Sequence, residues 1–279
     1  MGAFAQELET AAAAVKRAGA LVRENYARLE ESDVSEKAVN DLVTTVDVRS
    51  QEIVVSALRE RFPDDYIIAE EALPDAVNAG RDPHGRRRWY IDPLDGTTNY
   101  IHAYPVFGVS VALEVDGRMS VGATHAPLSG ELFCAARGHG ATLDGRPMRV
   151  SAVTARNRML LGTGFPFRAR QYLDVYLQSF SYFFNNARGV RRAGAATLDF
   201  ANVAAGRLDG FWEMTLSPWD MAAGVVLIEE AGGRVSDFFG GDSYLRSGHI
   251  VGTNGLLHEW MTGELSKIFS PEQDYSLRS

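Results

Sequence analysis

The chain has 279 residues, a formal net charge of −8 and a hydrophobic content of 46%. This length and composition support a substantial hydrophobic core, and they exclude a disordered or fibrous chain. The negative charge argues against a general nucleic-acid binder, because such proteins hold phosphate backbones with clustered lysines and arginines.

The first 150 residues are predicted to form two helices and a largely antiparallel sheet. Apolar side chains that recur every three to four residues predict the helices. Alternating apolar side chains on both sides of Asp116 and Gly117 predict a hairpin. In chain order, the predicted elements of this half are helices over 4–29 and 48–62 and strands over 66–69, 88–91, 106–115 and 119–124.

Beyond residue 150 strands and helices alternate, which indicates an α/β layer arrangement. The predicted elements are strands over 159–162, 187–191, 208–213, 234–236 and 249–251, and helices over 171–185, 196–205, 219–231 and from about 256. No flexible linker separates the two halves. We therefore expect an N-terminal α+β half over 1–150 and a C-terminal α/β half over 151–279, packed as one body with a crevice between them.

The clearest chemical signal lies where strand 88–91 ends. Asp92 follows the strand, and the turn through Pro93 and Leu94 brings Asp95 back to the same side. Two carboxylates this close repel each other unless a cation or a proton compensates their charge. Oxygen ligands of this kind select magnesium or manganese rather than zinc, and the Leu94 carbonyl is available as another ligand.

Residues 96–99, Gly-Thr-Thr-Asn, are typical of a helix start. Its free backbone N–H groups and the Thr97 hydroxyl would suit a phosphate next to the metal. Glu70 and Glu71 follow another strand, and Asp220 begins a later helix.

Two structural alternatives apply to these acids. Asp92 and Asp95 can form a simple turn, and Asp220 can simply cap its helix. A phosphatase of the haloacid dehalogenase type is disfavoured, because it needs two aspartates separated by one residue, and here two residues separate them.

Taken together, these motifs resemble the inositol monophosphatase family of magnesium-dependent, lithium-sensitive phosphatases. The match runs in order over nearly the whole chain. Its segments are 41–47 (Asp-Leu-Val-Thr-Thr-Val-Asp), Glu70-Glu71, 92–99 (Asp-Pro-Leu-Asp-Gly-Thr-Thr-Asn), 163–167 (Thr-Gly-Phe-Pro-Phe), 191–196 (Arg-Arg-Ala-Gly-Ala-Ala) and 218–224 (Pro-Trp-Asp-Met-Ala-Ala-Gly). The resemblance implies a layered αβαβα sandwich of the sugar-phosphatase type.

The resemblance also implies roles for individual residues. Two or three Mg²⁺ ions, replaceable by Mn²⁺, would bind per active site. The metal ligands would be Glu70, Asp92, the Leu94 carbonyl, Asp95 and Asp220. The residues that act on the attacking water would be Asp47 and Thr97, with Glu70 as a further catalytic residue. The residues that contact the substrate would be Asp95, Gly96, Thr97, Gly194, Ala195, Ala196, Glu213 and Asp220.

The implied reaction is hydrolysis of a small phosphorylated polyol, foremost myo-inositol monophosphate, by metal-activated water without a phosphoenzyme. Alternative substrates are histidinol phosphate, fructose 1,6-bisphosphate and a 3′-phosphoadenosine nucleotide. A second alternative is an added, non-catalytic role as a partner of RNA polymerase. We also expect a homodimer, no direct nucleic-acid binding and no membrane association. The single cysteine, Cys134, cannot form an internal disulfide and favours a cytoplasmic setting.

Overall fold

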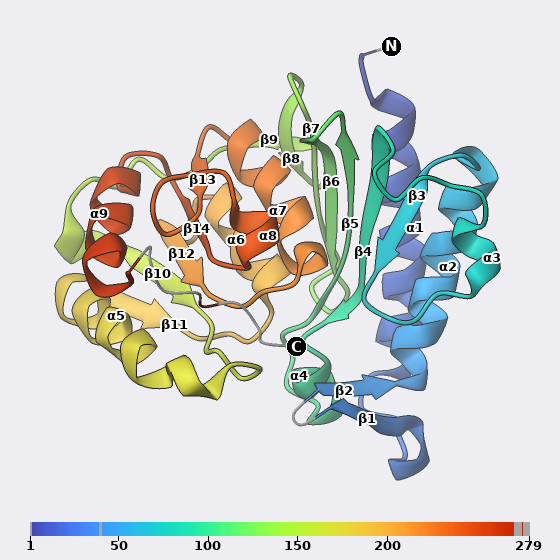
Figure 1. The fold of residues 1–279 in the computed structure, drawn as a ribbon, viewed down its shortest axis with the longest axis horizontal. Helices are drawn as coiled ribbons and strands as arrows, with labels where there is room; N and C mark the ends of the chain where they lie inside the picture. Colours follow the sequence, from blue (N-terminus) through green and yellow to red (C-terminus); the bar gives the residue numbers. More distant parts are fainter. Residues whose placement is uncertain (1, 39–40, 271–274, 276–279) are drawn as a thin grey trace.

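The protein is built in five layers, helices alternating with two β-sheets, and these layers confirm the αβαβα sandwich (Figure 1). A computed structural model describes residues 2–38, 41–270 and 275. Within these described residues, no helix combines the length and the apolar character needed to cross a membrane.

The larger sheet has seven strands in their order along the chain, and all its neighbours pair antiparallel except the first two strands. These strands are β3 (Tyr66–Ala69), β4 (Arg87–Asp95), β5 (Gly108–Val115), β6 (Arg118–Ala126), β7 (Glu131–Ala136), β8 (Gly140–Leu143) and β9 (Arg146–Met148). The turn predicted at Asp116 and Gly117 joins β5 to β6, and both residues have positive φ angles. The prediction of a largely antiparallel sheet is confirmed.

Two long helices, α1 (Ala5–Asn25) and α2 (Thr45–Arg61), cover the outer face of this sheet. Alanines and valines of α1 are completely buried there, as the apolar spacing predicted. The second helix begins three residues before its predicted start, because Thr44 caps it. The Thr44 hydroxyl accepts hydrogen bonds from the backbone N–H groups of Val46 and Asp47, and the Asp47 carboxylate accepts one from the Thr44 N–H.

The central layer consists of helices α6 (Ala196–Ala204) and α7 (Pro218–Glu230), which lie between the two sheets. The second sheet has the strand order β11-β10-β12-β14-β13. Its strands are β10 (Leu160–Thr163), β11 (Gly189–Arg191), β12 (Gly210–Glu213), β13 (Arg234–Ser236) and β14 (Ile250–Thr253). The central helices are apolar on nearly all sides, because both sheets pack against them.

Helices α5 (Leu173–Asn186) and α9 (His258–Ile268) form the last layer. The structure also contains short elements, of which the sequence pattern predicted one. They are the hairpin of β1 (Val34–Ala38) and β2 (Asp41–Thr44), helices α3 (Asp75–Asn78), α4 (Thr97–Ile101) and α8 (Tyr244–Ser247), and three single 3₁₀ turns, over 31–33, 156–158 and 170–172. Of these, α4 coincides with the helix start expected at residues 96–99.

Candidate active site

A cavity of about 490 Å³ opens between the ends of β3 and β4, the start of α4 and the N-termini of α6 and α7. Its volume lies within the range of small-molecule sites. It brings together carboxylates that are up to 150 residues apart in the sequence. The predicted metal ligands that line it are Glu70, Asp92, Leu94, Asp95 and Asp220.

The end of β4 bends into this cavity. The regular pairing of β4 with β5 stops after Asp92 and resumes only at Asp95, so the two residues between them form an irregularity in the strand. The Ser50 hydroxyl of α2 donates a hydrogen bond of 2.6 Å to the Pro93 carbonyl. This bond fixes the turn between the two aspartates, and both of their side chains line the cavity.

Burial in the cavity raises the pKa values of both aspartates. Burial, and then the negative charges of Glu70, Asp95 and Asp220, raise the pKa of Asp92 well above its usual range. Burial raises the pKa of Asp95 to about 6, although hydrogen bonds from Thr197 oppose the shift. Carboxylates that destabilise one another in this way favour binding of a cation or a proton.

Thr97 and Asp47 form a pair beside these ligands. The Thr97 hydroxyl lies 2.9 Å from Asp47 Oδ1 and 3.0 Å from the Leu94 carbonyl oxygen, and it can donate to either. Burial raises the pKa of Asp47 to about 6 in spite of hydrogen bonds from Thr44 and Thr97. A completely buried aspartate with this pKa can accept a proton near neutral pH.

Asp220 does cap its helix, as the structural alternative proposed, and it also lines the cavity. Its Oδ2 accepts a hydrogen bond of 2.8 Å from the Ser217 N–H at the start of α7. Arg168 reaches the same region, where it donates to the Ser217 hydroxyl at 3.2 Å and lies 3.8 Å from Glu70. Capping and metal binding are compatible, because a carboxylate has two oxygens.

The donor set fits a hard divalent cation, since it consists of carboxylates and one carbonyl oxygen. In the part of the chain that the structure describes, no three or more His, Cys, Asp or Glu side chains are grouped so that they could hold a metal ion directly. One oxygen each of Asp92, Asp95 and Asp220 accepts a hydrogen bond from the protein. Magnesium, which commonly keeps several waters, would require these side chains to turn toward it.

The residues of the predicted substrate wall also line the cavity, and they are Gly96, Gly194, Ala195, Ala196 and Glu213. Gly96 and Gly194 have φ angles of 88° and 89°. A Cβ atom on Gly96 would lie 3.0 Å from the Val106 carbonyl oxygen, so a side chain there is excluded on two grounds.

Several residues of the site were not predicted, among them Arg168, Thr197 and Asp199. Arg168 and Asp199 line the cavity, and Thr197 binds Asp95 from the first turn of α6. No local pattern marks them, because an arginine in a loop and polar residues in a helix usually face solvent. Glu71 is buried, and its backbone exchanges hydrogen bonds with the Gln51 side chain.

Comparison with known proteins gives a consistent result. The model of the inositol monophosphatase family matches residues 5–270. A protein of Pseudomonas aeruginosa described as Nus factor SuhB is 47% identical over 250 residues, which cover 88% of this chain and 91% of the relative. A solved inositol monophosphatase from Anabaena (Nostoc) sp. PCC 7120 is 36% identical, with a TM-score of 0.84 over 97% of this chain and 99% of that one. The extragenic suppressor protein suhB from Bartonella henselae is 33% identical, with a TM-score of 0.86 over 96% and 100% of the two chains.

Proposed function

Because this chain belongs to the inositol monophosphatase family, we propose that it is a magnesium-dependent phosphomonoesterase whose substrate is a small phosphorylated polyol, foremost myo-inositol monophosphate. One observation carries the proposal. Glu70, Asp92, Asp95 and Asp220 line a single cavity, although they come from three different segments of the chain.

We assign the cation ligands as the family resemblance implies. Glu70, Asp92 and the Leu94 carbonyl would hold one ion, and Asp92, Asp95 and Asp220 would hold another. Bound Mg²⁺ would lower the pKa of a water molecule and neutralise negative charge on the phosphate ester. The raised pKa of Asp92 supports this assignment, because its negative neighbours favour an added positive charge.

The chain's own groups then act on the water and the phosphate. The Thr97 hydroxyl, which donates a hydrogen bond to Asp47, orients the attacking water, and Asp47 receives the proton that this water loses. The backbone N–H groups of Gly96 and Thr97 bind phosphate oxygens at the start of α4. Glu213 and the segment 194–196 hold the polyol. No covalent phosphoenzyme is needed.

Substrate choice is the first test. We expect the purified protein to release phosphate from myo-inositol monophosphate faster than from histidinol phosphate, fructose 1,6-bisphosphate or a 3′-phosphoadenosine nucleotide. The activity should require Mg²⁺ and disappear with a chelator. Mn²⁺ should restore part of it. Equal phosphate release with and without the chelator would contradict the proposal.

A second function is favoured by the relatives of this chain described as Nus factor SuhB. We propose that the protein also contacts the transcription machinery, RNA polymerase included, as a non-catalytic partner. The exposed side chains of Arg188 and Arg191 are candidates for this contact, whereas Arg192 lines the catalytic cavity.

The two functions can be separated with one variant. Asp95→Asn removes a charge from the cavity and should lower phosphatase activity by about 100-fold or more. Binding to RNA polymerase in a pull-down with purified components should persist. If both are lost to the same extent while the fold is retained, the two functions are not separate.

The oligomeric state and the location of the protein stay predictions. A homodimer is expected, and the exposed side chains of Leu173, Leu177 and Phe184 on α5 provide apolar surface that could be buried in it. Sedimentation equilibrium would contradict this expectation if it gave the mass of a single chain.

A further inference from the structure

Asp199 is a buried acid to which the proposed mechanism assigns no role. It lies in the first turn of α6 and is only 3% exposed. Within the described part of the chain, no residue donates a hydrogen bond to its carboxylate. The carboxylate oxygens are not completely buried, so a ligand group in the adjoining space can reach them.

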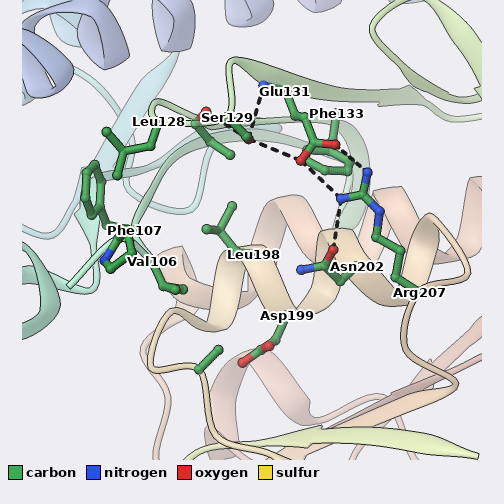
Figure 2. A pocket seen from close by; sticks show the side chains of 13 residues that line it. Val106, Phe107, Leu128, Ser129, Glu131, Phe133, Leu198, Asp199, Asn202 and Arg207 are labelled. Atoms are coloured by element: carbon green, nitrogen blue, oxygen red, sulfur yellow. Dashed lines mark hydrogen bonds and ion pairs between the residues drawn. The ribbon is translucent and has the colours of Figure 1, made fainter.

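The direction of this side chain identifies the space that it faces. Figure 2 shows a smaller pocket that is lined by Leu198, Asp199 and Asn202, and within it the Asp199 carboxylate points away from Leu198, to the other side of α6. On that side Asp199 lines the catalytic cavity. Its Oδ1 is 3.5 Å from the position that a Cβ atom on Gly162 would occupy, and the Leu208 and Phe211 side chains lie nearer to that position, at 2.9 Å and 3.2 Å.

Glu213 is the acidic neighbour of Asp199 in this part of the cavity. Burial, and then the charge of Asp199, raise the pKa of Glu213 well above its usual range. Burial, and then the charge of Asp95, do the same to the pKa of Asp199. Both acids are therefore easier to protonate than ordinary carboxyl groups, and a protonated carboxyl both donates and accepts hydrogen bonds.

The nearby cation determines which ligand suits this pair. Arg192 lies close enough to lower the pKa of both acids, and its guanidinium stacks 4.7 Å from the centre of the Phe167 ring. A positively charged ligand group would be repelled by Arg192. Neutral hydroxyl groups can use both the donor and the acceptor capacity of the acids, and they bring no charge into the cavity.

We propose that Asp199 is a specificity-determining residue that binds a hydroxyl group of the substrate's polyol, next to the hydroxyl bound by Glu213. The inference rests on the proposed phosphatase function and deepens it. The substrate class is then a phosphate ester of a polyol with neighbouring hydroxyl groups.

The test compares two substrates that differ in hydroxyl groups. Asp199→Ala should lower kcat/KM for myo-inositol 1-phosphate roughly 3- to 10-fold, the effect of one neutral hydrogen bond. The same variant should hydrolyse p-nitrophenyl phosphate, whose leaving group has no hydroxyl to bind, at the wild-type rate. Asp199→Asn should recover part of the loss, because an amide also donates and accepts.

A control variant and a stability measurement distinguish binding from a structural role. Asn202→Ala changes the same helix on the side of the smaller pocket, and it should leave the ratio of the kcat/KM values for the two substrates unchanged. In the presence of a chelator at pH 8, Asp199→Ala should unfold at a temperature equal to or above that of the wild type, since the buried acid is removed. A merely structural aspartate would give a lower temperature.

The outcomes separate the inference from the function on which it rests. Equal losses of kcat/KM with both substrates would overturn the role of Asp199 in hydroxyl binding and leave the phosphatase proposal standing. A loss that is found only with histidinol phosphate, whose leaving group bears an ammonium group, would do the same. Wild-type protein without Mg²⁺-dependent hydrolysis of either substrate would contradict the phosphatase proposal, and the inference with it.

Discussion

At the scale of single residues, the site depends on carboxylates that have two tasks. Asp220 caps α7, Asp47 caps α2, and Asp95 binds the first turn of α6. In each case one oxygen accepts a hydrogen bond from the backbone or a neighbouring hydroxyl. The fold thus fixes the direction of each acid, and this preorganisation is what a catalytic site requires.

Thr197 provides the sharpest test at this scale. Its hydroxyl and its backbone N–H bind Asp95 Oδ2 at 2.6 Å and 2.7 Å. Thr197→Ala would remove the hydroxyl, loosen Asp95 and raise its pKa further. We expect Mn²⁺ affinity, measured by calorimetry on the substrate-free protein, to fall about 10-fold or more, the value of a hydrogen bond to a charged group.

The matched variant for this test is Thr197→Ser, which keeps the hydroxyl and should retain near wild-type affinity for Mn²⁺. Equal affinities of the Ala and Ser variants would show that the backbone N–H groups alone position Asp95.

At the scale of elements, close packing of α7 against the larger sheet places Asp220 at the cavity. The backbone of α7 approaches β6 where a glycine, Gly122, faces Ala223. A Cβ atom on Gly122 would lie 2.6 Å from the Ala223 carbonyl oxygen, which is closer than such atoms approach. The contact depends on small residues on both elements.

Gly122→Ala should therefore push α7 away from the sheet. We expect a loss of about 1–3 kcal/mol in the free energy of unfolding, measured by urea denaturation. Gly263 of α9 is the control, because a Cβ atom there has no atom within 4 Å. Gly263→Ala should be neutral or stabilise the protein by up to about 1 kcal/mol through its higher helix propensity. A tolerated Gly122→Ala would contradict the close contact.

At the scale of the whole molecule, acidic side chains from different layers of the fold lie near one another at the cavity, and their negative charges repel. Acids from the larger sheet, from α2 and from the central helices converge there, and burial raises several of their pKa values. The folded protein therefore binds protons more tightly at these groups than the unfolded chain does. Its stability must depend on pH and on divalent cations together.

The sign of this dependence follows from the raised pKa values of Asp47 and Asp95, about 6 in the folded state against an ordinary 3.8. Their contribution to stability is fully present below pH 3.8, and it is lost as pH rises through 6. In a chelator, thermal melts should show a Tm roughly 5 °C or more lower at pH 8 than at pH 5.

Added Mg²⁺ should reverse this loss, and its effect on Tm should grow with pH because the ligands must lose their protons to bind it. A Mg²⁺-induced shift that is equal at pH 5 and pH 8 would show that these acids do not bind the ion.

The sequence determined the elements and their type, because periodicity is a local property of the chain. Helices α1, α5, α6 and α7 and most strands lie within a few residues of their predicted ranges. The motif around Asp92 and Asp95 also predicted acids at a strand end and a helix start after them, and the order of the motifs indicated the family.

Only the tertiary structure decided which of these residues meet. Thr197 and Asp95 are 102 positions apart, and neither a strand pattern nor a helix pattern relates them. Arg168 beside Glu70, and Asp199 facing the catalytic cavity, likewise depend on how the central helices sit between two sheets. Local patterns specify which face of an element is apolar. The partners of a polar side chain are set instead by packing between distant segments. The chemistry of this cavity depends on those long-range contacts.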